Sequence, residues 1–420
     1  MSTATLRFTP AEGWRYGLLG LPLAFVALPL YVLLPNHYAR AFGMPLAALG
    51  AVLLAARLLD AFFDPWIGRV CDRFFARSPR AVLRLGAAAA AVLAAGFALL
   101  FFPPMRGQAA LLTWATSTLV LTSLAFSALS IAHQSWGAML GGDEALRSRV
   151  VAWREGFGLA GVLLASILPL VAGLAVTALV LAGALAVAWA AWMRSPQPRP
   201  EAHATPPSWR LPWRTPAFRR LLAVFVLNGV ATAVPATLVL FFVQDRLQAP
   251  AVMEPLFLAA YFMCGAAAIP AWLALVPRLG LARTWLAGML LAVAAFAGAA
   301  GIEAGDTAGF LVVCMLAGAA LGTDLALPGA LLAGVIAGAG HTGRAEGAYF
   351  GWWNCAAKLN LALAAGLALP LLALAGYLPG SRAPQALQAL AFAYCVLPCL
   401  LKLAAATLLW RTLIHPGDPP

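Results

Sequence analysis

The sequence predicts an all-α integral membrane protein with twelve transmembrane helices in two six-helix bundles. Of its 420 residues, 63% are hydrophobic and only 10% are charged, and the mean hydropathy is +0.88. Because soluble domains carry about a quarter charged residues, this composition excludes a water-soluble enzyme. The apolar residues also form charge-free runs of roughly 20 residues or more, the length that spans a bilayer.

Dividing these runs at clusters of charge, proline and glycine gives the twelve expected spans. They are 16–38, 46–70, 82–103, 109–140, 149–171, 174–194, 217–243, 253–276, 281–302, 307–337, 345–376 and 385–412. The first span is expected to be retained, since no small-residue cleavage site of a signal peptide follows it. The proline-rich segment 195–216 is the expected cytoplasmic linker between an N-terminal bundle, 1–194, and a C-terminal bundle with a short tail, 217–420.

Arginine placement predicts the orientation, because cytoplasmic loops of membrane proteins are enriched in Arg and Lys. With the N-terminus inside, the outer loops hold only Arg40, Arg106, Arg246 and Arg382, and the inner loops hold most other arginines. Both termini are therefore expected in the cytoplasm. The net charge of +12 is assigned to these loops and not to nucleic-acid binding. An Ala- and Arg-rich chain with two lysines indicates a GC-rich bacterial genome, hence an inner membrane.

The two halves repeat one feature, a basic turn after the second span of each. Gly68-x-x-x-Asp72-Arg73 in the first half corresponds to Arg278-x-Gly280-x-x-Arg283 in the second. Two parallel six-helix repeats are typical of secondary transporters, whose solute site lies near the midplane between them. The chain has neither a His-Glu-x-x-His nor a Gly-x-Ser-x-Gly motif, and its six cysteines show no zinc or disulfide pattern.

Charged residues inside spans are costly and therefore mark function. Arg57, Asp60 and Asp64 share one face of the second span, and Lys358 in the eleventh is the expected counter-charge. Two such carboxylates near a cation can take up and release a proton, or exchange it for a metal cation. The hypothesis is cation coupling at Asp60 and Asp64; the alternative is a structural ion-pair network.

Other polar and aromatic residues within spans are candidates for substrate binding. Asp324 is flanked by residues that can bend a helix, so it either lines the pathway or caps a helix break. His133, Trp136 and Trp353 either contact substrate, with the tryptophans stacking on a sugar ring, or pack structurally. Lys402 in the last span is expected to extend its ammonium group to the inner surface.

Three stretches resemble one family. Arg57 to Gly68 reads R-L-L-D-A-F-F-D-P-W-I-G and is followed by Asp72 and Arg73. Arg147 and Arg154 follow the fourth span, and the stretch 343–350 precedes Trp353 and Lys358. These features resemble the glycoside-pentoside-hexuronide:cation symporters, the melibiose-permease-like branch of the major facilitator superfamily.

The resemblance implies the major facilitator fold, with sugar held between the bundles. It implies that Asp60 and Asp64 bind the coupling cation and that Arg57 and Lys358 belong to the same polar network. It also implies an inner gate, which we assign to Asp72, Arg73, Arg147 and Arg154. Two family acids are replaced, by Ala24 and His133. Since Na⁺ needs several oxygen ligands, this loss favours H⁺ over Na⁺, although Asp60 and Asp64 leave Na⁺ open.

The sequence therefore predicts cation-coupled symport of a small polar solute, a sugar or glycoside, by alternating access. No cofactor other than the coupling ion, H⁺ or Na⁺, is expected. The expected partners are the solute and the lipid bilayer, without nucleic acid, and the protein is expected to function as a monomer. The alternatives are a lysolipid or amphipath symporter of the same fold and a membrane receptor that does not transport.

Overall fold

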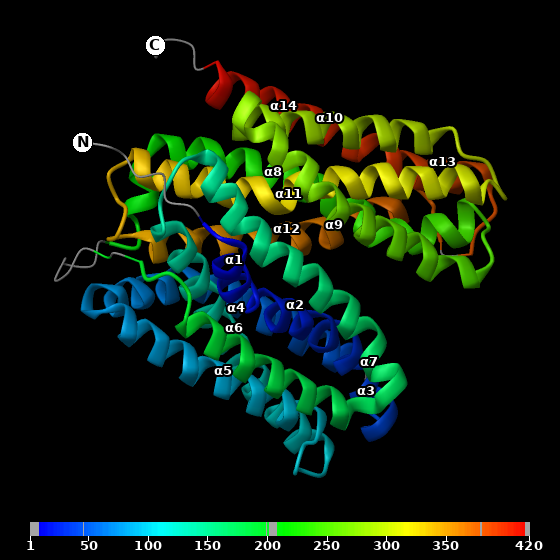
Figure 1. The fold of residues 1–420 in the computed structure, drawn as a ribbon. Coiled ribbons are helices and arrows are strands. Elements are labelled where there is room, and N and C mark those ends of the chain that lie inside the picture. The colour runs from blue at the N-terminus through cyan, green and yellow to red at the C-terminus, as the bar shows by residue number, and fades with distance from the viewer. Residues whose placement is uncertain (1–7, 45, 199, 201–207, 379, 416–420) are drawn as a thin grey trace. The chain divides into compact units, whose positions relative to one another are not determined.

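The computed structural model describes residues 8–44, 46–198, 200, 208–378 and 380–415, and every regular element in these ranges is helical. Expected linker residues 199 and 201–207 lie outside the described residues. The first half contains α1 Pro10–Gly17, α2 Gly20–Leu28, η1 Pro29–Leu33, α3 Leu34–Phe42, α4 Leu46–Arg77, α5 Pro79–Phe101, α6 Gln108–Met139 and α7 Glu144–Met193 (Figure 1). The remainder contains η2 Leu211–Arg214, α8 Pro216–Phe241, η3 Phe242–Arg246, η4 Ala251–Met253, α9 Glu254–Leu279, α10 Leu281–Ala300, α11 Thr307–Gly338, α12 Glu346–Leu374, α13 Pro384–Ala391, η5 Phe392–Val396, α14 Leu397–Leu409 and η6 Trp410–Ile414.

Eight of the helical segments in the described ranges are long and apolar enough to cross a membrane. They are α5, α6, α7, α8 with η3, α9, α10, α11, and the run from α13 to η6. The other expected spans correspond to α4, to α12 and to the run from α1 to α3.

Helix α7 contains two of the expected spans. It has 50 residues, about 75 Å at 1.5 Å per residue, whereas the hydrocarbon core of a bilayer is about 30 Å thick. Gly173, with φ +78° and ψ 170°, interrupts the helical backbone, and the ribbon turns back there (Figure 1). Glycine permits this positive φ because it has no Cβ. The break falls between the expected spans 149–171 and 174–194.

The first helix of the described residues, α1, is capped at Thr9 and packs closely on α7. The Thr9 side chain accepts a hydrogen bond from the Glu12 amide, and Glu12 accepts one from the Thr9 amide, which forms a capping box. Gly17 and Gly20 then face the backbone of Trp153 and Arg154, where any Cβ would overlap carbonyl groups. Small residues at this contact allow close approach of the helices.

The chain forms two compact units. The first comprises Met1–Thr215 with Ala333–Cys355, and the second comprises Pro216–Leu332 with Ala356–Pro420. Helices α11 and α12 therefore contribute residues to both units. The expected domains 1–194 and 217–420, which assign each helix to a single bundle, stay predictions.

Candidate functional site

The carboxylates of α4 lie in the interior of the first unit. Asp60 is 3% exposed and Asp64 is fully buried. Asp60 Oδ1 accepts a hydrogen bond of 2.8 Å from Ser127 Oγ on α6. Phe62 and Trp66 on the same helix are largely exposed, at 68% and 49%. Around these positions, helix α4 thus turns its acids inward, which places the two candidate coupling residues on a buried face.

The other two residues of the expected polar network are half-buried. Arg57 lies one turn before Asp60 on α4, and Lys358 lies on α12. Arg57 belongs to the first unit and Lys358 to the second. Their joint action with Asp60 and Asp64 stays a prediction.

His133 and Trp136 of α6 lie in the packed core of the first unit. The His133 ring is 2.8 Å from the Tyr16 carbonyl through Nε2 and stacks on the Tyr16 ring with centroids 4.3 Å apart. Trp136 is fully buried, and its indole N–H donates to the Pro196 carbonyl at 2.9 Å. It also contacts the ring of Trp192. These contacts favour the packing alternative for both residues, and their substrate role stays a prediction.

Asp72, one of the expected gate residues, binds the N-terminus of α12. Its two carboxylate oxygens accept hydrogen bonds from the amides of Gly347 at 2.6 Å and Ala348 at 2.9 Å. The first amides of a helix lack intrahelical partners and carry a partial positive charge. One turn earlier on α4, a Cβ on Gly68 would overlap the Gly347 carbonyl oxygen. The backbones of α4 and α12 are therefore in direct contact beside Asp72.

The three expected gate arginines lie in different surroundings. Arg73 is exposed. Arg154 forms an ion pair with the adjacent Glu155 on α7. A Cβ on Gly334 would lie 3.0 Å from an Arg147 guanidinium nitrogen, so Arg147 lies beside the end of α11. A gate function for these residues stays a prediction.

Trp353 lies in the first turns of α12, in a region held by aromatic contacts. It is 6% exposed. Its neighbour Trp352 donates its indole N–H to the Trp209 carbonyl at 2.8 Å and stacks on the Trp209 ring. Trp66 stacks on the same ring. Trp209 therefore fixes the end of the linker against α4 and α12, while the substrate role expected for Trp353 stays a prediction.

A hydrogen-bonded chain precedes this region in the connection between α11 and α12. His341 Nδ1 lies 2.8 Å from the Tyr349 hydroxyl, which lies 2.6 Å from the Thr215 hydroxyl. Burial, and then the positive charge of Arg344, lower the pKa of His341 below its ordinary value. The neutral imidazole is therefore favoured in this connection.

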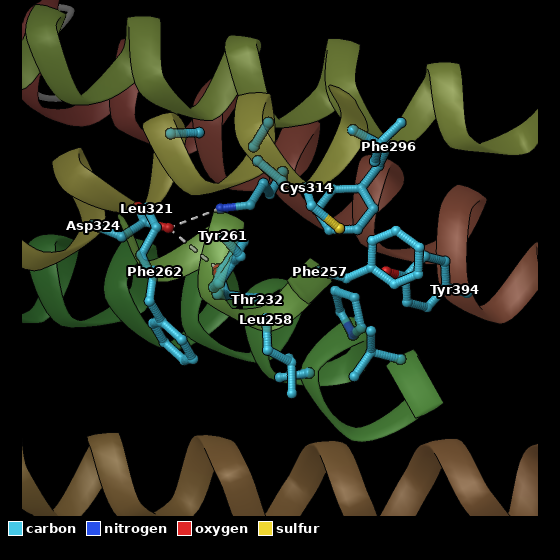
Figure 2. A pocket seen from close by; sticks show the side chains of 18 residues that line it. Thr232, Phe257, Leu258, Tyr261, Phe262, Phe296, Cys314, Leu321, Asp324 and Tyr394 are labelled. Carbon is cyan, nitrogen blue, oxygen red and sulfur yellow. Dashed lines mark hydrogen bonds and ion pairs between the residues drawn. The ribbon is translucent and has the colours of Figure 1, made fainter. Parts of the chain in front are cut away.

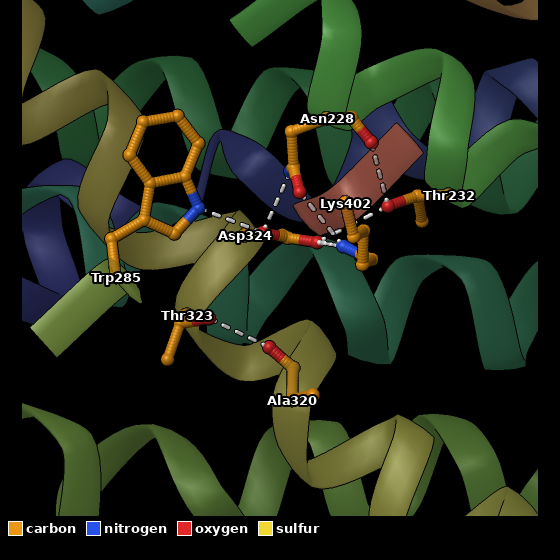
Figure 3. Close-up of polar contacts among 7 residues, drawn as sticks. All are labelled: Asn228, Thr232, Trp285, Ala320, Thr323, Asp324 and Lys402. Carbon is orange, nitrogen blue, oxygen red and sulfur yellow. Dashed lines mark hydrogen bonds and ion pairs between the residues drawn. The ribbon is translucent and has the colours of Figure 1, made fainter. Parts of the chain in front are cut away.

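The second unit contains a largely buried ion pair between Asp324 of α11 and Lys402 of α14, whose side chains are 14% and 3% exposed. Lys402 Nζ lies 3.0 Å from Asp324 Oδ2 and 2.8 Å from Asn228 Oδ1 (Figure 3). Lys402 is only 2% exposed. The expectation that Lys402 extends to the inner surface is therefore wrong, because the Asp324 carboxylate and an amide oxygen hold its ammonium group inside the unit.

Three further donors converge on Asp324. The Asn228 amide and the Trp285 indole N–H donate to Oδ1 at 2.9 and 2.8 Å. The Thr232 hydroxyl lies 3.2 Å from Oδ2 and 3.1 Å from the Asn228 carbonyl, so two acceptors share its proton. The sequence analysis did not single out Asn228 or Trp285. The one signal available for them was the polar amide of Asn228 within an apolar span.

A cavity of about 180 Å³ lies beside this ion pair, within the second unit. Asp324, Lys402 and Thr232 supply polar groups to its lining, and most of the remaining wall is apolar or aromatic (Figure 2). The aromatic residues are Phe257, Tyr261, Phe262, Phe296 and Tyr394. This arrangement places the Asp324–Lys402 ion pair next to aromatic rings, on which the apolar face of a ligand can lie. Asp324 therefore lines a cavity of the second unit, and its role in a substrate pathway stays a prediction.

A further buried carboxylate among the described residues of the second unit is Asp245 in η3. It accepts hydrogen bonds from the Tyr377 hydroxyl and the Gly380 amide, the latter at 2.9 Å. Burial, and then this bond with Asp245, raise the pKa of the Tyr377 phenol above its ordinary value. The cluster connects the end of α8 and η3 to the segment between α12 and α13.

Comparison with known proteins gives a family model that matches nearly the whole chain and a curated relative that matches part of it. The model of a family described as "MFS/sugar transport protein" matches residues 15–415. The "Inner membrane symporter YicJ" of Escherichia coli (strain K12) is 25% identical over 170 residues, which are 40% of this chain and 36% of that protein. The chain therefore matches well under half the length of this curated relative.

Solved structures share the fold at low sequence identity. A bacterial homologue of the iron transporter ferroportin in its outward-facing state has a TM-score of 0.72 at 16% identity, covering 95% of this chain and 98% of that one. The E. coli fucose:proton symporter FucP has a TM-score of 0.64 at 15% identity, covering 93% of this chain and 98% of that one. These likenesses show the major facilitator fold expected from the sequence.

Proposed function

We propose that this chain, which belongs to the MFS/sugar transport protein family, is a proton-coupled symporter of a sugar or glycoside. Membership of the family makes it a membrane transporter and not an enzyme. The curated relative that matches part of the chain is an inner membrane symporter, which supports symport. Transport proceeds by alternating access, in which one solute site opens to each side of the membrane in turn.

One observation carries the coupling proposal: Asp60 and Asp64 are buried one turn apart on α4. Burial penalises an ionised carboxylate, so a proton on Asp60 removes the penalty. In the proposed cycle, Asp60 binds the proton first, and the carrier then closes around the solute. Arg57 and Lys358 stabilise the carboxylates after the proton has left.

The Ser127 hydroxyl supports a proton in preference to Na⁺ at this position. It donates to Asp60 Oδ1, and a hydroxyl can also accept a hydrogen bond from a protonated carboxyl group. The hydrogen bond between Ser127 and Asp60 can therefore form whether Asp60 is ionised or protonated, because the Ser127 hydroxyl can rotate. A bound Na⁺ would instead require several oxygen ligands.

Substitution of Asp60 by asparagine tests the proposal. Asparagine keeps the size of the side chain but binds no proton, so Asp60→Asn should reduce uphill uptake to background in proteoliposomes with an imposed inward proton gradient. The probes are radiolabelled glucose, galactose, xylose and their methyl and phenyl glycosides. Glu303→Gln removes an exposed acid and should leave uptake unchanged. Uphill uptake by Asp60→Asn, or uptake that follows a sodium gradient alone, would contradict proton coupling at Asp60.

The cavity of the second unit also favours a second candidate, transport of an amphipathic solute. Its wall is largely apolar, and Asp324, Lys402 and Thr232 supply charged and polar groups. A lysolipid combines an apolar chain with a polar headgroup. Uptake of radiolabelled lysophosphatidylcholine, without uptake of any saccharide, would favour this candidate over the first.

A further inference from the structure

We propose that Lys402 is a substrate-binding residue, held in place by Asp324, and that its ammonium group donates to an uncharged oxygen of a ring-shaped ligand in the cavity of the second unit. The inference rests on the proposed transport of a sugar or glycoside and adds the site, the contact residue and the charge of the ligand. Asp324 is a positioning residue in this proposal.

The hydrogen bonds of Asp324 leave little capacity for substrate. Oδ1 accepts from Asn228 and Trp285, and Oδ2 accepts from Lys402 and shares the Thr232 hydroxyl. An ionised carboxylate has about four acceptor positions, and these four donors occupy them. A ligand hydroxyl would have to displace one of the donors. Asp324 is therefore suited to orient Lys402 and not to bind the ligand directly.

Lys402 keeps one donor for a ligand. An ammonium group has three N–H donors, and two acceptors within the described part of the chain contact Nζ, namely Asp324 Oδ2 and Asn228 Oδ1. Lys402 also lines the cavity. Its third N–H is therefore available to an acceptor atom there.

Charge balance favours an uncharged acceptor. Lys402 and Asp324 neutralise each other at 3.0 Å. A ligand carboxylate or phosphate at Lys402 would add an uncompensated negative charge at a nearly buried position, which is costly. A hydroxyl, ether or carbonyl oxygen would complete the hydrogen bonds of the ammonium group without that cost.

The cavity wall favours a ring with an apolar face. Tyr261 and Tyr394 line it together with Phe257, Phe262 and Phe296. The two tyrosines also bring phenol groups to this wall, and a hydroxyl can both donate to and accept from a ligand oxygen. Aromatic faces stack on apolar ring faces. The expected ligand is an uncharged glycoside with an apolar aglycone, of which phenyl β-D-glycosides are the simplest probes.

Binding in lipid nanodiscs tests the site without any ion gradient. Calorimetric titrations use phenyl β-D-glucoside, β-D-galactoside and β-D-xyloside. At least one should bind saturably, and phenyl β-D-glucuronide should bind at least tenfold more weakly than the glucoside. Lys402→Met with Asp324→Leu removes both charges and preserves an apolar interior, so it should fold and lose at least tenfold in affinity. Leu403→Met, an exposed neighbour on α14, should bind as the unmodified protein does.

Further variants separate the positioning role of Asp324 from a structural one. Asp324→Glu keeps a carboxylate for Lys402 and should retain more affinity than Asp324→Asn, with both affinities measured at a temperature at which both variants are folded. The proposal would be overturned if the Lys402→Met, Asp324→Leu double variant bound the glycoside as tightly as the unmodified protein does. It would also be overturned if the glucuronide bound more tightly than the glucoside, or if lysophosphatidylcholine bound and no glycoside did. Asp60→Asn should still bind the phenyl glycoside. Binding without uphill uptake in the unmodified protein would overturn the coupling proposal alone.

Discussion

At the scale of single residues, compensation of buried charge determines which substitutions the chain tolerates. Lys402 and Asp324 are paired and hydrogen-bonded within the second unit. Removing one member of such a pair leaves the other charge buried without compensation, which costs about 3–5 kcal/mol, whereas replacing both by apolar residues is often close to neutral. We therefore expect Lys402→Met to lower the melting temperature sharply.

Thermal unfolding of the purified protein measures this difference. Lys402→Met with Asp324→Leu should melt near the unmodified protein, and Lys402→Met alone well below it. Leu403→Met on the same helix provides the control. A single variant as stable as the double variant would show that the pair contributes no such coupling.

The sequence identified individual charges more readily than their partners. Asp60, Asp64 and Asp324 stood out because an acid within a span is costly. Lys402 was misassigned, because a lysine near the end of a span can extend to the membrane surface and its actual partners lie 174 and 78 residues away. The stacking of His133 on Tyr16 similarly joins residues 117 positions apart. Such pairings depend on how the helices pack, which no local pattern encodes.

At the scale of helices, the close contact between α4 and α12 depends on glycine. A Cβ on Gly68 would overlap the Gly347 carbonyl, whereas a Cβ on Gly50 of the same helix meets nothing. Gly68→Ala should therefore separate the two backbones and lengthen the hydrogen bonds from the Gly347 and Ala348 amides to Asp72. The variant should have a lower melting temperature and reduced uptake, while Gly50→Ala should match the unmodified protein. Equal behaviour of the two variants would contradict a packing role for Gly68.

Helix positions were more predictable than helix interruptions. The expected spans coincide with helical segments because length and hydropathy determine them. The five-residue π-helical turns η1, η3, η5 and η6 have no comparable sequence signal, since they arise from local adjustments of backbone hydrogen bonding. The break at Gly173 was predicted only to within a few residues, by the gap between two apolar runs.

At the scale of the whole molecule, the number of membrane crossings in α7 determines the side on which everything after it lies. If the N-terminus is cytoplasmic and α7 crosses twice, with its turn at Gly173, the linker after Met193 is cytoplasmic. If α7 crossed once, that linker would lie outside, and the arginines following it would oppose the positive-inside rule.

Reporter fusions in a Gram-negative host distinguish these topologies. Alkaline phosphatase, active only outside the cytoplasm, should be active when fused after Met105 or Gly173. Green fluorescent protein, which fluoresces in the cytoplasm, should fluoresce when fused after Pro196 or Ile414. Phosphatase activity after Pro196, with activity also retained after Met105, would mean that α7 crosses once. Activity after Pro196 but not after Met105 would instead mean that the orientation is inverted. In either case Arg210 and Arg214 of the linker would face the exterior, and the inverted orientation would also place Asp72 at the exterior end of α4.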